Sequence, residues 1–164
     1  MDVSRTNYLE PGCVQEGCAM TDFTRSYTDI ETAHAGHIIQ WDNQDKTVVL
    51  QQYTRSATKD DLYYLAQKSA ALLETVPYTV HLIIDERLFK LTLNSADIKF
   101  LEKNVPANQG AVVVIYGNLS LMYKQTIHAT NKKVAPKVFE KGLFVPSLED
   151  ARQLLQEQFG VQYP

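Results

Sequence analysis

Two apolar runs constrain the fold of this chain more than any other feature. Residues 80–85, Val-His-Leu-Ile-Ile-Asp, are almost continuously apolar and then give way to charge at Glu86 and Arg87. Residues 110–116, Gly-Ala-Val-Val-Val-Ile-Tyr, have the same character. A strand that is apolar on both faces, and polar where it leaves the sheet, is typical of the centre of a parallel sheet. We therefore predict a sheet with these two runs near its centre.

A strong helical pattern precedes the first run. Thr58 is a good N-cap residue, and the two acids that follow, Asp60 and Asp61, suit the positive end of a helix. Apolar residues then recur at helical spacing from Leu62 to Val76, which gives the helix one apolar face. Pro77 should end it.

Further helices are predicted over 95–104, 120–131 and 148–159. Ser95 and Ser147 are the expected N-caps of the first and last of these, and Gly160 is a typical C-terminal stop. The last helix should bury one stripe of side chains, which consists of Leu148, Ala151, Leu154, Leu155 and Phe159.

Two short runs near the start, 37–41 and 47–53, read as strands. The turn formers of residues 42–45 separate them, so we predict an antiparallel hairpin. A last short strand is predicted at 143–145. The resulting order is ββαβαβαβα, with about five strands and about four helices. This order predicts the α/β class, with a single mixed, mostly parallel sheet covered by helices.

The chain has 164 residues, which is the size of one domain with a substantial core. Residues 1–35 are polar, acidic and without clear periodicity, so we expect a mobile leader, followed by the folded domain over 36–164. Met20 is a second candidate start of translation. If it is the true one, residues 1–19 do not belong to the native protein, and mass spectrometry of that protein would decide the point.

The net charge and the lack of long apolar stretches limit which partners and which cellular compartment are expected. The net charge of −3 argues against nucleic acid as a partner. No apolar stretch reaches the length of about 20 residues that a transmembrane helix needs, so no transmembrane segment is expected. The first 20 residues lack the apolar core of a secretory signal, and the expected location is therefore cytoplasmic.

A metal site would have to use the two cysteines, Cys13 and Cys18, together with His34 and His37. We favour the simpler reading, in which the two cysteines are free thiols in the leader, and expect no metal site. We also expect no cofactor, since the chain contains neither a Walker sequence nor a glycine-rich dinucleotide motif.

Several stretches resemble a known family, the STAS domains of the anti-sigma-factor antagonists, and within it the small stand-alone SpoIIAA-like proteins. The stretches are Trp41, residues 80–85, Val-Pro-Ala-Asn-Gln-Gly at 105–110 with the strand that follows, and Phe-Val-Pro-Ser-Leu-Glu-Asp-Ala at 144–151. The resemblance implies a non-enzymatic regulatory or scaffolding module that binds a partner protein. It also leaves open an alternative, a carrier of a small apolar or lipid-like ligand in a pocket of about 300 Å³ or more between helix and sheet. A homodimer is compatible with either function.

In the signalling members of that family, a strand that ends in Asp is followed at once by a serine that a kinase phosphorylates. Here Asp85 is followed by Glu86 and Arg87 instead. Ser95 is the nearest hydroxyl at the start of a predicted helix, and it is therefore the candidate phosphorylation site.

Ligands of open α/β sheets tend to lie beyond the carboxyl ends of the strands. The candidate binding residues at those ends are Arg55, Asp85, Arg87, Tyr116 and Asn118. They would form a rim that grips an anionic or amphipathic partner. The competing interpretation is structural: Asp85 bonds loop amides, and Arg87 pairs with Glu86 or Asp97.

A second candidate surface is basic. Residues 120–145 carry a net charge of +4, so the rest of the chain sums to −7. The candidate residues of this basic face are Lys124, Lys132, Lys133 and Lys137. Such a face would suit an acidic protein, an anionic headgroup or a membrane surface, although a solvated lysine face without a partner is the simpler reading.

No catalytic residue is predicted. Asp85 and Glu86 are adjacent in a strand and should point to opposite faces, so they do not make an acid–base pair. His81 lies inside an apolar strand, and His128 has no nucleophile beside it in the sequence. We therefore expect that the protein is not an enzyme.

Overall fold

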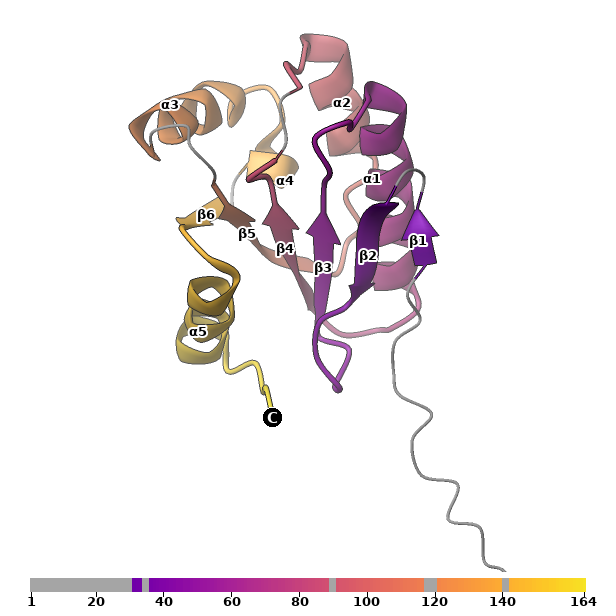
Figure 1. Cartoon of the computed structure of the whole chain (residues 1–164), viewed down its shortest axis with the longest axis vertical. Coiled ribbons are helices and arrows are strands. Elements are labelled where there is room, and N and C mark those ends of the chain that lie inside the picture. Colours follow the sequence, from indigo (N-terminus) through magenta and orange to yellow (C-terminus); the bar gives the residue numbers. More distant parts are fainter. Residues whose placement is uncertain (1–30, 34–35, 89–90, 117–120, 140–141) are drawn as a thin grey trace, which may run out of the picture.

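The six strands of the sheet follow one another in space in the same order as in the chain (Figure 1). The structure is a computed structural model, and it describes residues 31–33, 36–88, 91–116, 121–139 and 142–164. The strands are β1 (Glu31–Ala33), β2 (His37–Trp41), β3 (Val48–Gln52), β4 (Val80–Asp85), β5 (Gln109–Ile115) and β6 (Gly142–Val145). The helices are α1 (Lys59–Glu74), α2 (Ser95–Lys103), α3 (Leu121–Asn131), α4 (Pro136–Phe139) and α5 (Leu148–Phe159).

The sheet is mixed. Strands β1, β2 and β3 are antiparallel neighbours, whereas β3, β4, β5 and β6 run parallel to one another. The predicted α/β class, the N-terminal hairpin and the mostly parallel sheet are thus confirmed. Two short elements, β1 and α4, were not expected. Since β1 pairs with β2, the sheet begins inside the segment that we expected to be leader, and of that segment residues 1–30 and 34–35 lie outside the described part.

Neighbouring residues of the central strands point to opposite faces of the sheet, so each strand contributes to two cores. On one face lie Ile39, Val49, Leu82, Val112 and Val114, and on the other lie Val48, Leu50, Ile83, Val113 and Ile115. This explains why residues 80–85 and 110–116 are apolar at almost every position. Figure 1 shows the consequence: α1 and α2 cover one face, and α5 covers the other.

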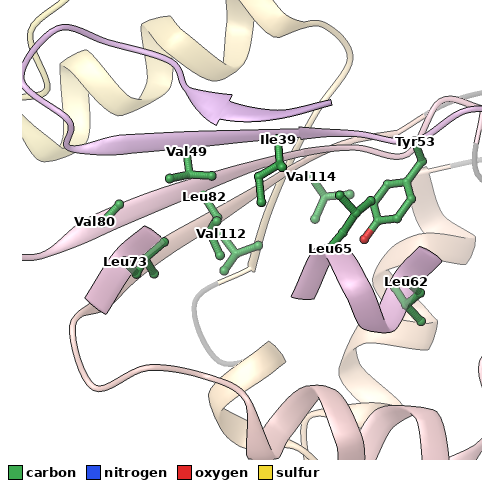
Figure 2. Packing of buried hydrophobic residues seen from close by; sticks show 10 residues of the cluster. All are labelled: Ile39, Val49, Tyr53, Leu62, Leu65, Leu73, Val80, Leu82, Val112 and Val114. Atoms are coloured by element: carbon green, nitrogen blue, oxygen red, sulfur yellow. The ribbon is translucent and has the colours of Figure 1, made fainter. Parts of the chain in front are cut away.

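The core beneath α1 is closely filled. Figure 2 shows Leu62, Leu65 and Leu73 of α1 packed against side chains of β2 to β5. The phenol of Tyr53 is buried in the same cluster, where it reaches Gln51, and the Gln51 amide donates to the Ser69 hydroxyl. These polar groups, from β3, the residue after it and α1, therefore satisfy one another inside an otherwise apolar core.

The helix ends show which local signals were read correctly. Thr58 caps α1 as predicted: the Asp61 amide donates to its hydroxyl, and the Asp61 carboxylate accepts from the Thr58 amide. In α2 the prediction was wrong, because Asn94 is the N-cap and Ser95 is the first helical residue. The same reciprocal bonding, between Asn94 and Asp97, explains that choice.

The C-terminal helix is bounded as expected by Ser147 and by Gly160, which has a left-handed φ of 68°. Ala151 and Leu155 are buried, but Phe159, predicted to be buried, is 43% exposed. Phe159 lies in the last turn of α5, where its ring contacts the imidazole of His81. None of the helices within the described ranges has the length and apolar character that crossing a bilayer requires.

Candidate functional site

The candidate site lies where the parallel strands end. In the register of the sheet Gln52 of β3 is opposite Asp85 of β4, and Asp85 is in turn opposite Ile115 of β5. The residues that follow these three positions therefore leave the sheet at one edge. We call the group formed by Arg55, Lys59, Arg87, Ser95 and Tyr116 the carboxyl-edge surface. Two of these residues, Lys59 and Ser95, are the first residues of α1 and α2, the helices that follow β3 and β4.

Asp85 and Arg87 form the best-defined contact at this edge. The Arg87 guanidinium donates from Nε to Oδ1 at 2.9 Å and from Nη2 to Oδ2 at 2.7 Å, and the Arg87 backbone amide donates to Oδ1 at 3.1 Å. The Gln52 side chain adds a weaker bond to Oδ2 at 3.3 Å. Arg87 therefore pairs with Asp85, an acid that we had not considered as its structural partner.

The charges of this pair stabilise each other. Burial alone would raise the pKa of the Asp85 carboxyl, but the hydrogen bonds from the Arg87 side chain and amide outweigh it and hold the pKa below its usual value. In return, the hydrogen bonds to Asp85 raise the pKa of Arg87. The predicted role of Asp85 in bonding loop amides is correct, since it accepts from the amide of Arg87.

A second ion pair joins the beginnings of α1 and α2. The Lys59 ammonium donates to Oδ2 of Asp97 at 2.8 Å, and the Tyr63 hydroxyl donates to Oδ1 of the same carboxylate. The Asn94 amide donates to Oδ2 at 2.7 Å. With the Lys59 bond as the largest cause, these donors lower the pKa of Asp97 to about 2. The hydrogen bond to Asp97 raises the pKa of Tyr63.

Both ion pairs have the same orientation with respect to solvent. The side chains of the acids are almost completely buried, at 9% exposure for Asp85 and 2% for Asp97. Their basic partners are 48% exposed in Arg87 and 41% exposed in Lys59. The carboxyl-edge surface thus keeps its paired acids inside and presents the bases to solvent.

The remaining rim candidates are placed less closely together. Arg55 is exposed in the connection between β3 and α1 and makes no hydrogen bond or ion pair with any described residue. Tyr116 is half-buried directly after β5, and its amide donates to the Val145 carbonyl. Asn118 lies outside the described residues. Ser95 is exposed at the beginning of α2, directly after the N-cap residue Asn94, which is hydrogen-bonded to Asp97.

A buried histidine lies just beneath this surface. His37 is fully buried at the start of β2, and its Nδ1 accepts a hydrogen bond from the Thr54 amide at 3.0 Å. Its Nε2 is 3.4 Å from Oδ2 of Asp61 and has no closer partner among the described residues. The hydroxyl of Thr58 is the main cause that lowers the pKa of Asp61, and His37 adds to it. The contact therefore holds β2, β3 and α1 together.

The other predicted groups lie apart from the carboxyl-edge surface. Lys132, Lys133 and Lys137 are exposed around α4, and the side chain of Lys124 lies outside the described part. In the described ranges no three acids, histidines or cysteines come together as metal ligands, and Cys13, Cys18 and His34 lie outside those ranges. His81 uses Nδ1 to accept from the Ala111 amide, so this nitrogen serves the pairing of β4 with β5.

One groove bears on the alternative carrier function. It has a volume of about 260 Å³ and runs between α1 and the end of α2. Its lining includes the charged side chains Glu74 and Lys103, and Ala70, Ala71 and Pro106 provide the apolar part. The groove is open to solvent, and the space between α1 and the sheet is filled by leucines (Figure 2). An enclosed apolar pocket, which a carrier would need, is not what this groove provides.

Three contacts near the carboxyl-edge surface were missed at the level of sequence. The spacing of Asn94 and Asp97 is a helix-start signal, and it could have identified the correct cap of α2. The pairing of Lys59 with Asp97 gave no such signal, because these residues are 38 positions apart and meet only when α1 and α2 pack side by side. The His37–Asp61 contact likewise depends on the packing of α1 beside β2.

The chain matches no protein-family model, and no curated protein or solved structure is significantly similar to it.

Proposed function

We propose that the protein is a non-enzymatic regulatory or scaffolding module, similar to STAS domains, that binds a partner protein at its carboxyl-edge surface. One observation carries the proposal. At this edge the acids Asp85 and Asp97 are buried, while the bases that neutralise them, Arg87 and Lys59, are half exposed. Arg55 adds an exposed guanidinium in the connection between β3 and α1.

An arrangement of this kind suits recognition of an anionic partner segment. A guanidinium offers several donors in a planar fork that matches a carboxylate or a phosphate. In Arg87 part of the fork is held by Asp85, so its direction is fixed before any partner arrives. Arg55 is not held by a described residue, and it is free to adjust to the partner. A fixed base together with an adjustable one at the same edge of the sheet favours specific binding without a catalytic step.

The polar groups near this surface support a binding role rather than a chemical one. Asp61 accepts from the N-cap amide of α1 and faces His37, Asp97 accepts from the N-cap amide of α2, and Asp85 accepts from the Arg87 amide after β4. Each of these carboxylates already accepts hydrogen bonds from the backbone, so its role is to hold the segments that carry the exposed bases.

Arg55 is the residue that tests the proposal cleanly. Changing Arg87 or Lys59 would also release a buried carboxylate, whereas Arg55→Glu reverses a charge without breaking a contact between described residues. We expect capture of the partner from a native lysate, quantified by mass spectrometry, to fall at least about ten-fold, as the loss of one charge-assisted contact implies. The melting temperature should stay unchanged.

The matched control is Lys103→Glu. Lys103 is exposed in the last turn of α2, at the opposite end of that helix from Ser95, and the substitution makes the same change in charge. It should leave capture unchanged. Equal capture by both variants and the unmodified protein would reject the carboxyl-edge surface as the binding site.

A further inference from the structure

The exposed side chains that the structure describes in helix α3 are uncharged. Its exposed side chains, among those that the structure describes, are Leu121, Met122, Gln125, Thr126, Ala129 and Thr130. None of the six is charged, whereas a helix exposed to water normally has charged residues on its outer face. Met122 is 75% exposed, the largest exposure among the described large apolar side chains. Figure 1 shows α3 at one end of the molecule, next to α4.

Unpaired lysines follow this face directly. Lys132, Lys133 and Lys137 are exposed, and none of them forms an ion pair with a described residue. Val134, between them in the sequence, is 50% exposed. No acid occurs from residue 121 to residue 139, although the chain as a whole carries a net charge of −3. We call the set Leu121, Met122, Lys132, Lys133, Val134 and Lys137 the α3–α4 surface.

The α3–α4 surface is fixed to the rest of the fold. The carboxylate of Glu102 in α2 accepts hydrogen bonds from the amides of Lys137 and Val138, at 3.2 and 3.1 Å. These are the free amides at the beginning of α4, so α2 holds α4 in place. The lysines around α4 are therefore held in a fixed position relative to the rest of the domain.

We propose that the α3–α4 surface docks the protein onto an anionic lipid surface. The lysines bind the headgroups, and Met122, Leu121 and Val134 enter the layer beneath them. An acidic protein surface would complement the lysines, but it would place its charged groups against these exposed apolar side chains. A lipid interface offers both kinds of contact at once, and the lysine stems can lie along its apolar layer while the ammonium groups stay at the headgroups. The α3–α4 surface shares no residue with the carboxyl-edge surface, and different variants test the two proposals.

Vesicle flotation of the full chain tests the proposal. Vesicles of phosphatidylcholine alone should not retain the protein, whereas vesicles of equal parts phosphatidylcholine and phosphatidylglycerol should retain it, less so as salt is raised. The double variant Lys132→Gln with Lys133→Gln should weaken retention about 30-fold, because each lysine near an anionic surface contributes to the attraction. Met122→Ser keeps the charge and should weaken it about 5-fold through lost apolar burial.

The matched control is Lys99→Gln with Lys103→Gln, two exposed lysines of α2, which makes the same change in net charge. It should retain the binding of the unmodified protein, and all variants should melt at the same temperature. Three outcomes would overturn the proposal. The first is absence of retention on anionic vesicles, and the second is an equal loss in the control. The third is lysine-dependent binding to soluble polyglutamate without any effect of Met122→Ser, which would assign the surface to an acidic protein instead.

Discussion

His37 and Asp61 face each other across 3.4 Å, Nε2 to Oδ2, although one begins β2 and the other lies in the first turn of α1. The opposite ring nitrogen of His37 accepts a hydrogen bond from the Thr54 amide, so that nitrogen carries no proton. The proton of the neutral ring is therefore on Nε2, the nitrogen that is 3.4 Å from the Asp61 carboxylate. That contact lacks the alignment of a hydrogen bond. Through these two contacts the imidazole joins three elements beneath the carboxyl-edge surface.

We predict that His37→Ala lowers the free energy of unfolding by about 2–4 kcal/mol, measured by urea denaturation. The change leaves a cavity where the ring was fully buried, and it leaves the Thr54 amide without its acceptor. Nitrogen-15 NMR of the unmodified protein should show the Nε2–H tautomer. A neutral ring protonated on Nδ1 would contradict the contact with Thr54.

Substitutions of Arg87 and of Arg55 should differ in their effect on the free energy of unfolding. Arg87→Gln removes two hydrogen bonds to the buried Asp85 carboxylate, and we expect a loss of about 1–2 kcal/mol, a modest figure because the guanidinium is half exposed. Arg55→Gln should change the free energy of unfolding, measured by urea denaturation, by less than about 0.5 kcal/mol. Equal effects of the two substitutions would mean that the pair with Asp85 does not form.

Acid should weaken the fold through Asp97, Asp85 and Asp61. Hydrogen bonds lower the pKa of each, so the unfolded chain takes up protons at a higher pH than the folded one. The stability that these carboxylates contribute is complete above their ordinary pKa of about 4, and it is lost as the pH falls towards about 2, the folded pKa of Asp97.

Urea midpoints measured between neutral pH and about pH 2 check this expectation. Asp97→Asn should be less stable at neutral pH and should lose less on acidification. Asp45→Asn, at an exposed turn position, is the control and should keep the slope of the unmodified protein. The Asp97 contribution would be refuted by parallel curves for all three proteins.

A side chain at Gly110 should damage the pairing of β4 with β5. A Cβ atom there would lie 2.7 Å from Nδ1 of His81 and 2.8 Å from Cγ2 of Thr79, and the same His81 nitrogen accepts the Ala111 amide. We predict that Gly110→Ala costs about 1–3 kcal/mol.

Gly160→Ala is the comparison, because no atom lies within 4 Å of its added Cβ and only the left-handed φ of 68° opposes it. Its cost should be about 1 kcal/mol. Thermal melts of the two variants report the difference. A harmless Gly110→Ala would show that the His81 ring can move aside.

A negative charge at Ser95 should affect binding without harming the fold. Ser95 is the first residue of α2, where a negative charge interacts favourably with the helix dipole by about 0.3–1 kcal/mol. Ser95→Asp should therefore melt at the same or a slightly higher temperature. Because it adds negative charge to the carboxyl-edge surface, capture of an anionic partner should fall. Ala107→Asp, in the loop that enters β5, is the control and should leave capture unchanged.

Elements with strong local signals were predictable from the sequence. Helix α1 begins at the predicted cap, and α5 lies between the predicted Ser147 and Gly160. The two most apolar runs became β4 and β5, in the interior of the sheet. In these segments periodicity, caps and apolar content all favour the same structure, so no tertiary information was needed.

The remaining features depend on tertiary contacts. Strand β1 has three residues and exists through its pairing with β2, in which Ala33 is opposite His37. Helix α4 has four residues and begins at amides that Glu102 holds from another helix. The rule for parallel strands predicted Arg55, Arg87 and Tyr116 at this edge, but it did not predict Lys59. It also did not predict that the acids point inward, because their orientation depends on which side chains the neighbouring helix covers.

The strands lie in the sheet in the same order as in the chain. During synthesis, each new strand therefore emerges after the strand with which it pairs. The sheet can thus grow from one edge, and α1 and α2 cover one of its faces as growth proceeds. The opposite face of the sheet is covered only after the C-terminal residues have been synthesised. Val48, Leu50, Ile83 and Val113 are covered by Ala151, Leu155 and Val161, which lie within the final 14 residues of the chain. A nascent or prematurely ended chain therefore carries a bare apolar sheet face, and in the cell chaperone contact should concentrate there.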